Sequence, residues 1–218
     1  MLISQKIHNK VETFLQQQMA GDCDRLMPRY RQDDLAKLFM WGLNSVLQDE
    51  LPKRETLEDI EGLMSEDSGP VVHQLADLVP LASNEDTLVR IVQGTLYIYQ
   101  KGYWCGVENI APWVMGLAHL PVWRKPNKID KAGEVAVSWQ SYALSDLIRF
   151  NMPDLTGVCK AVMELEQIQD PSFFDIEHKA AGGVCLRDAY LKVEKVDGKW
   201  QAYAEEHSPG HKATFRLE

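Results

Sequence analysis

Residues 190–204 read YLKVEKVDGKWQAYA, two alternating runs of apolar and polar residues joined by Asp197 and Gly198. An Asp-Gly pair between two such runs favours a two-residue type I′ turn, because the twist of that turn matches the twist of the strands it joins. The stretch therefore predicts a β-hairpin, which is the strongest local signal in the sequence.

Pairing across this turn divides the hairpin into two faces. One face is mainly apolar and holds Leu191, Val193, Trp200 and Ala202. The other face is polar and holds Lys192, Glu194, Lys199 and Gln201. We expect the apolar face to be buried. Because an isolated hairpin is only marginally stable in water, we also expect a third strand, from residues 213–217 or 134–140.

The first half of the chain is dominated by helical patterns. Residues 3–19 and 33–49 each place apolar side chains on one face at helical spacing. Residues 85–100 are apolar on nearly all sides of a helical projection, so we predict a buried central helix there. Shorter helices are predicted at 56–64, 70–79, 109–117 and 154–168, and 144–150 fits a short helix or a strand.

These patterns predict an α+β protein, in which an irregular helical bundle in the N-terminal half packs against a small antiparallel sheet with a C-terminal hairpin. We assign residues 1–120 to a predominantly helical part and residues 134–218 to a mixed part that contains the hairpin 190–204. The Lys- and Pro-containing stretch 121–133 separates them. We expect the two parts to share one core, because aromatic residues flank this short boundary.

Composition limits the classes of partner. The 218 residues include 23 basic and 32 acidic side chains, a formal net charge of −9. This balance argues against a broad surface for nucleic acid or for an anionic membrane, because both would be repelled. No run approaches the ~20 apolar residues of a membrane helix, and the first residues do not resemble a signal peptide. Four cysteines without two-residue spacing indicate free thiols, so we expect a cytoplasmic protein without a cofactor.

Cys185 and His178 form a candidate catalytic pair. Cys185 follows Gly182 and Gly183, and a thiolate at an exposed turn near a histidine can act as a nucleophile. That chemistry would suit a cysteine-dependent hydrolase or transferase. The alternative, which we prefer, makes the glycines a flexible turn and Cys185 a small apolar residue in a strand that begins near Val184.

His207 and His211, which follow Glu205 and Glu206, have the residue types of a metal site. Histidines four residues apart share a face only on a helix, and Pro209 between them opposes a helix. We therefore interpret this stretch as a polar loop and predict no metal site.

Aromatic side chains are frequent around residues 97–123. Aromatic residues with small neighbours can line an apolar pocket for a small ligand. The residues of this candidate aromatic pocket are Tyr99, Tyr103, Trp104, Trp113, His119 and Trp123. The alternative is that the large rings fill the junction between the two parts of the chain.

Acidic residues gather in and before the expected helix at 56–64. A surface of this kind attracts a basic partner and steers its approach. The candidate partner-binding residues are Glu55, Glu58, Asp59 and Glu61. The alternative is an ordinary solvated helix face.

The sequence contains no glycine-rich phosphate loop, nucleophile elbow or zinc-protease motif. We therefore predict an acidic, cytoplasmic protein-binding module, such as an adaptor, regulator or inhibitor, without catalytic activity. Its expected partner is another protein with a basic surface rather than a membrane or a nucleic acid. A small-molecule binding protein that uses the aromatic pocket and a cysteine-dependent enzyme are the two alternatives.

Overall fold

The structure is a computed structural model that describes residues 2–19, 30–51, 87–124, 140–147, 152–175 and 183–217. Its contacts divide the chain into two compact units, each made of two separate stretches. Unit 1 holds Met1–Pro80 and Ala111–Val162, and unit 2 holds Leu81–Ile110 and Met163–Glu218. This division is interleaved along the chain. The predicted boundary at residues 121–133, with one core shared by both parts, stays a prediction. The described elements combine helices with small antiparallel sheets, so the protein is α+β, as predicted.

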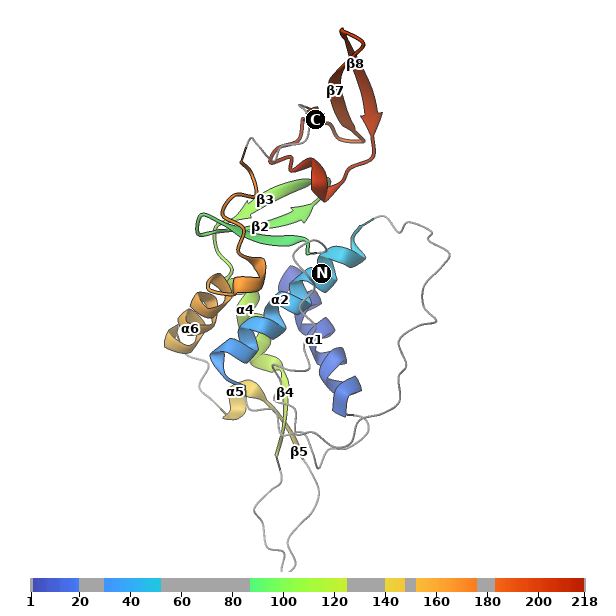
Figure 1. Ribbon diagram of the computed structural model, residues 1–218. Coiled ribbons are helices and arrows are strands. Elements are labelled where there is room, and N and C mark those ends of the chain that lie inside the picture. Colours follow the sequence, from blue (N-terminus) through green and yellow to red (C-terminus); the bar gives the residue numbers. More distant parts are fainter. Residues whose placement is uncertain are drawn as a thin grey trace, which may run out of the picture. The chain divides into compact units, whose positions relative to one another are not determined.

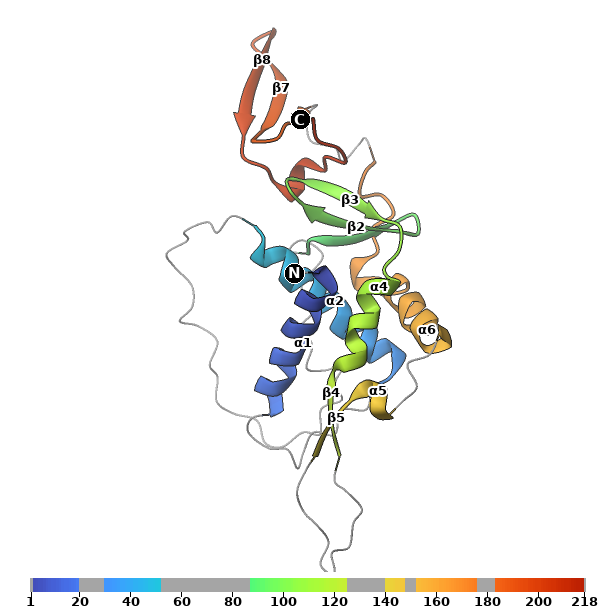
Figure 2. The same cartoon turned by 180° about the vertical axis from the view of Figure 1, so that it is seen from behind.

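Unit 1 is built on two long helices, α1 (Ile3–Met19) and α2 (Gln32–Asp49), which lie side by side in both views (Figure 1, Figure 2). Both were predicted from their apolar stripes, and both are confirmed. Ile7 and Val11 of α1 are fully buried, and they lie directly over Gly42 of α2. The missing side chain at Gly42 therefore lets the two helices approach closely.

The rest of unit 1 consists of short elements. They are α4 (Ala111–Val114), η1 (Met115–His119), β4 (Pro121–Arg124), β5 (Gln140–Ala143), α5 (Leu144–Leu147) and α6 (Met152–Met163). Strands β4 and β5 pair antiparallel. The predicted helix at 109–117 corresponds to α4 and η1, and the ambiguous stretch at 144–150 begins as helix α5.

Other predictions for the helices have different outcomes. The helix predicted at 154–168 is formed by α6 and by the 3₁₀ helix η2 (Glu166–Ile168). The helices predicted at 56–64 and 70–79, and the strand at 134–140 apart from Gln140 in β5, lie outside the described residues.

Unit 2 begins with an antiparallel sheet in the order β1 (Val89–Val92), β2 (Thr95–Gln100) and β3 (Tyr103–Val107). The prediction of a central helix over 85–100 is therefore wrong. All four residues of β1 are buried. A strand that is buried on both faces is apolar at consecutive positions, so its sequence resembles that of a buried helix.

The same type of two-residue turn occurs three times in the described part of the chain. Each turn joins two paired strands through two residues with positive φ: Gln93 and Gly94, Lys101 and Gly102, and Asp197 and Gly198. Two consecutive positive φ angles identify a type I′ turn. Glycine adopts this conformation without strain, which explains why it is the second residue of all three turns.

The C-terminal sheet of unit 2 contains β6 (Gly183–Cys185), β7 (Tyr190–Val196) and β8 (Lys199–Glu205), in that order. The predicted hairpin is confirmed with its register. Its third strand is β6, so neither predicted partner supplies it. Leu217 instead forms a single parallel bridge beside β6, where its N–H donates to the Cys185 carbonyl at 2.9 Å.

Candidate functional site

The register of the C-terminal sheet places its apolar side chains together. Residues that pair directly across strands point to the same face. Leu191 pairs with both Val184 and Ala204, and Val193 pairs with Ala202. We call the resulting surface the apolar face, and its residues are Val184, Leu186, Leu191, Val193, Trp200, Ala202 and Ala204. Lys195, opposite Trp200, is the charged residue on the same face.

This apolar face is open to solvent, although the sequence predicted that it would be buried. Trp200 is 72% exposed, and Leu186 at one side of the face is 37% exposed. Ala202 and Ala204 are also exposed. The prediction failed because β6 extends the sheet sideways and does not cover it. An exposed tryptophan on a predominantly apolar sheet surface marks an interaction site more often than a lone exposed side chain does.

The opposite face of the hairpin carries a network of charged and polar side chains. Tyr203 donates a hydrogen bond to the Glu194 carboxylate. The Lys192 ammonium lies 3.3 Å from Glu194 and 3.5 Å from Glu205. The hydrogen bond from Tyr203 lowers the pKa of Glu194, and the same bond raises the pKa of Tyr203 to about 12. Lys192, Glu194, Tyr203 and Glu205 thus bind one another on the polar face.

The base of the hairpin is anchored to the rest of unit 2, while its turn points away from β2 and β3 in both views (Figure 1, Figure 2). Tyr190 is buried and stacks on the His211 ring, with centroids 3.9 Å apart. Trp104 of β3 binds the segment that follows the hairpin, because its indole N–H donates a hydrogen bond to the Pro209 carbonyl at 3.0 Å. The hairpin is therefore fixed at one end, and most of β8 is exposed while most of β7 is half-buried.

Cys185, the candidate nucleophile, lies at the end of β6 and is 2% exposed. Its thiol is within 3.5 Å of the Gly102 carbonyl, to which it can donate. Burial raises the pKa of this thiol, and Arg216 lowers it to a smaller extent. A raised pKa keeps the sulfur protonated at neutral pH, the reverse of what a nucleophile requires. His178, its proposed partner, lies outside the described residues.

The two loop histidines contact different groups. The His207 Nε2 lies 2.8 Å from the Leu186 carbonyl oxygen, and the His211 Nε2 lies 3.1 Å from the Glu205 carboxylate. Over the residues that the structure describes, no group of three or more His, Cys, Asp or Glu side chains is placed to hold a metal ion. Each histidine instead fastens the C-terminal chain to the sheet.

Two of the six residues of the candidate aromatic pocket belong to the core of unit 2. Tyr99 and Trp104 are 2% and 1% exposed, with ring centroids 5.5 Å apart. Trp104 also packs edge-to-face on Phe173 at 4.8 Å. Arg90 is buried beside them, with its guanidinium carbon 5.4 Å from the Phe173 ring centre. Burial lowers the pKa of Arg90, and nearby Asp170 opposes that shift.

The other candidate residues are distributed elsewhere. Trp113 and His119 lie on α4 and η1, and Trp123 lies on β4, so these three belong to unit 1. Tyr103 lies at the start of β3 in unit 2, where Arg216 approaches its ring at 5.8 Å. The acidic residues Glu55, Glu58, Asp59 and Glu61 lie outside the described residues.

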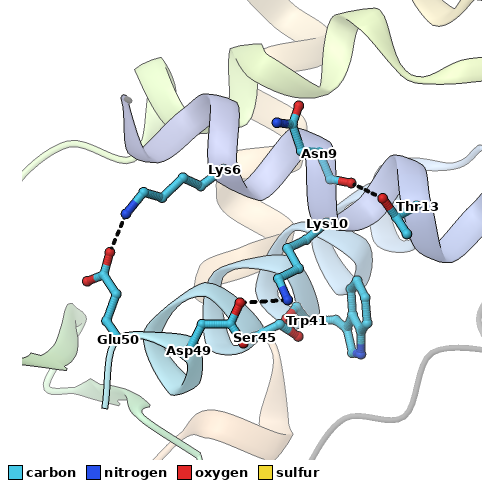
Figure 3. Close-up of polar contacts among 8 residues, drawn as sticks. All are labelled: Lys6, Asn9, Lys10, Thr13, Trp41, Ser45, Asp49 and Glu50. Carbon is cyan, nitrogen blue, oxygen red and sulfur yellow. Dashed lines mark hydrogen bonds and ion pairs between the residues drawn. The ribbon is translucent and has the colours of Figure 1, made fainter. Parts of the chain in front are cut away.

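A groove of about 670 Å³ runs between α1 and α2, and the sequence did not reveal it (Figure 3). Phe14 and Trp41 form an aromatic contact in its lining, with ring centroids 4.6 Å apart. Two ion pairs join the helices there: Lys6 with Glu50 at 2.6 Å, and Lys10 with Asp49 at 2.7 Å. These residues occupy ordinary helical positions, so only the pairing of the two helices makes the groove recognisable.

Comparison of the chain with protein-family models, with curated proteins and with solved structures found no match. Within the described ranges, no helix has both the length and the apolar character that crossing a membrane requires. The assignment of a function therefore depends on the surfaces described above.

Proposed function

We propose that this chain is a protein-binding module, and that the apolar face of the C-terminal sheet is its recognition surface. The observation that carries the proposal is the 72% exposure of Trp200 on a face whose other residues are aliphatic except for Lys195. Tryptophan is among the residues that contribute most to binding energy when a partner covers them. The anchored base of the hairpin keeps this face in a fixed shape, which lowers the entropy lost on binding.

The proposed partner is a protein segment with apolar side chains and a basic flank. The apolar side chains match Leu191 and Val193, which follow each other along β7 on this face, and Trp200 on β8, which lies diagonal to Val193. The basic flank follows from the net charge of −9 of the whole chain, which attracts cationic partners over long range. Residues 183–217 themselves contain six basic and five acidic side chains, so the attraction comes from the rest of the chain. The proposed location is the cytoplasm, where thiols such as those of Cys105, Cys159 and Cys185 stay reduced.

A photo-crosslinking amino acid placed at position 200 or 201 tests the proposal. The two positions are neighbours on β8, but they point to opposite faces of the sheet. We expect position 200 to yield a discrete adduct in cell extract, with a mass that is not a multiple of the chain mass. Position 201 is the matched control and should not yield it. Equal adducts from both positions, or none from either, would contradict the proposal.

The groove between α1 and α2 supports a second candidate function, the binding of a small amphipathic molecule. Its volume of about 670 Å³ lies within the ~300–1,000 Å³ that is typical of ligand sites. Its lining combines the rings of Phe14 and Trp41 with polar groups such as Asn9 and Thr13. A thermal-shift screen tests it, because a ligand that binds the native state raises the melting temperature. Thr13→Trp, which fills the groove, should abolish any such shift.

A further inference from the structure

We propose that two copies of this chain pair through the outer edge of β8, joining their C-terminal sheets into one six-stranded antiparallel sheet. In the described part of the chain, β8 pairs with β7 alone. The other edge of the sheet is different, since Leu217 bonds to the backbone of β6 there. Among the described residues, the sheet therefore has one edge with a bonded neighbour and one edge without, the open edge.

The backbone groups on the open edge follow from the hairpin geometry. A type I′ turn at Asp197 and Gly198 makes Val196 and Lys199 a hydrogen-bonded pair. In an antiparallel ladder, hydrogen-bonded and non-hydrogen-bonded pairs alternate. The N–H and C=O groups of residues 199, 201, 203 and 205 therefore point towards β7. Those of Trp200, Ala202 and Ala204 point outwards, which leaves three donors and three acceptors on the open edge.

The sequence of β8 is self-complementary in one antiparallel register. When Ala202 lies opposite Ala202 of the second copy, Trp200 lies opposite Ala204, a large side chain beside a small one. In the same register Lys199 lies opposite Glu205 of the second copy, and the two-fold axis repeats this pair. All six outward backbone groups are then bonded. Moving the centre of symmetry to residue 201 or 203 separates Lys199 from Glu205 and leaves some of those groups unpaired.

Local charge also permits two copies to meet here. Residues 183–217 contain six basic and five acidic side chains, although the whole chain has a net charge of −9. The self-repulsion that opposes association of an acidic protein is therefore weak at this sheet. In addition, β8 has seven residues, contains no proline and pairs with β7 without a bulge. A very short strand, a proline and a bulge are three of the devices by which proteins protect an edge strand, and β8 has none of these three. Its charged residues, Lys199 and Glu205, lie at its two ends.

The pairing goes beyond the proposed function and does not depend on it. It uses the backbone edge, whereas the proposed partner covers the apolar face. Since side chains of paired strands keep their faces, the two apolar faces become one continuous surface with a Trp200 from each copy. If position 200 does not crosslink to another protein, the proposed pairing of two copies is unaffected. If the two copies do not pair, the proposed recognition surface is unaffected.

Sedimentation velocity of the full chain is the first test. We expect a species of twice the 24.8 kDa chain mass that dissociates on dilution. Disulfide crosslinking then tests the register. Ala202→Cys places two thiols opposite each other, with Cα atoms ~5.5 Å apart, and should give a covalent dimer on mild oxidation. Ala204→Cys is the matched control, because its two thiols are offset by four residues, ~14 Å along the strand, and should not crosslink.

Charge reversal tests the same contact without cysteine chemistry. Lys199→Glu and Glu205→Lys should each weaken self-association about tenfold, because each creates two like-charged cross-strand pairs. An equimolar mixture of the two variants should restore the dimer, since every pair in the heterodimer is again opposite in charge. Thermal melting of each variant alone shows whether it folds. A monomer at all concentrations, equal crosslinking at 202 and 204, or no recovery in the mixture would overturn the proposal.

Discussion

Tyr203 donates a hydrogen bond across the β7–β8 ladder to the carboxylate of Glu194, and this contact shifts the pKa of both groups. The pairing is diagonal, since Tyr203 lies directly opposite Lys192. The Lys192 ammonium completes the network at 3.3 Å from Glu194. The contact lies on the polar face of the sheet. Because it shifts the pKa of Tyr203 and of Glu194, titration of either group can detect it.

Removal of the Tyr203 hydroxyl should change the alkaline titration. The raised pKa means that the folded state holds this proton longer than the unfolded chain does. The associated stability is therefore present below pH ~10 and is lost between pH ~10 and about 12. In an absorbance titration of phenolate, Tyr203→Phe should lose one tyrosine that ionises near pH 12. Loss of a tyrosine that ionises near pH 10 would contradict the hydrogen bond.

For Glu194 the dependence of stability on pH has the opposite sign to that for Tyr203. Its pKa is lowered in the folded state, so its contribution is present above its ordinary value and is lost as the pH falls through the folded value. Tyr203→Phe should therefore raise the pKa of Glu194, as measured by carbon-detected NMR titration. Lys192→Met should raise it further, because that change removes the nearby positive charge.

The three type I′ turns predict a graded series of glycine substitutions. Gly94→Ala and Gly198→Ala should each cost about 1 kcal/mol, because alanine is strained at φ +78° and +79° but meets no neighbour. Gly102→Ala should cost more, since its Cβ would lie 2.6 Å from the His207 ring. The Leu186 carbonyl at 2.8 Å restrains that ring. Urea unfolding checks the order, and equal losses at all three sites would contradict it.

The turns also show how far the sequence could predict this fold. Asp197 and Gly198 are a strong turn signal, and the hairpin they predicted is present with its register. Gln93 and Lys101 are weaker turn residues before glycine, so the apolar run around them looked like one buried helix. The strands β1 and β2 became recognisable only through the positive φ angles at these turns. A turn with strong sequence preferences could be predicted. The sequence alone could not decide whether an apolar stretch forms a buried strand or a buried helix.

The candidate site was predicted in part. Alternation along the hairpin correctly grouped Leu191, Val193, Trp200 and Ala202 on one face. The predicted burial is wrong for Trp200 and Ala202, which are exposed, whereas Leu191 and Val193 are half-buried. Periodicity shows which side chains share a face but not whether another element covers it. The aromatic residues between 97 and 123 were grouped by their closeness in sequence. The chain passes from unit 2 to unit 1 within that stretch, at Ile110 and Ala111.

Replacement of Trp200 and replacement of Trp104 should change the free energy of unfolding by very different amounts. Trp200→Ser should change the free energy of unfolding by less than about 0.5 kcal/mol, because the side chain is 72% exposed. Trp104→Ala should cost about 3–5 kcal/mol, since Trp104 is 1% exposed and its indole N–H bonds to the Pro209 carbonyl. Urea unfolding measures both. A large loss from Trp200→Ser would show that this side chain supports the fold and would argue against a recognition role.

Gly42 offers a test of the helix pair that forms the groove. A Cβ at this position would lie 2.8 Å from Val11 Cγ2 and 3.0 Å from Ile7 Cγ2. Gly42→Ala would gain about 1 kcal/mol in helix propensity, but the contact with buried Val11 should outweigh that gain and destabilise unit 1. In a Val11→Ala background the closer of the two contacts is removed, so the same substitution should be clearly less destabilising. A double-mutant cycle by urea unfolding should give a coupling energy of about 1 kcal/mol or more. Additive effects would mean that α1 and α2 do not pack through Gly42, and the groove between them would then lack its structural basis.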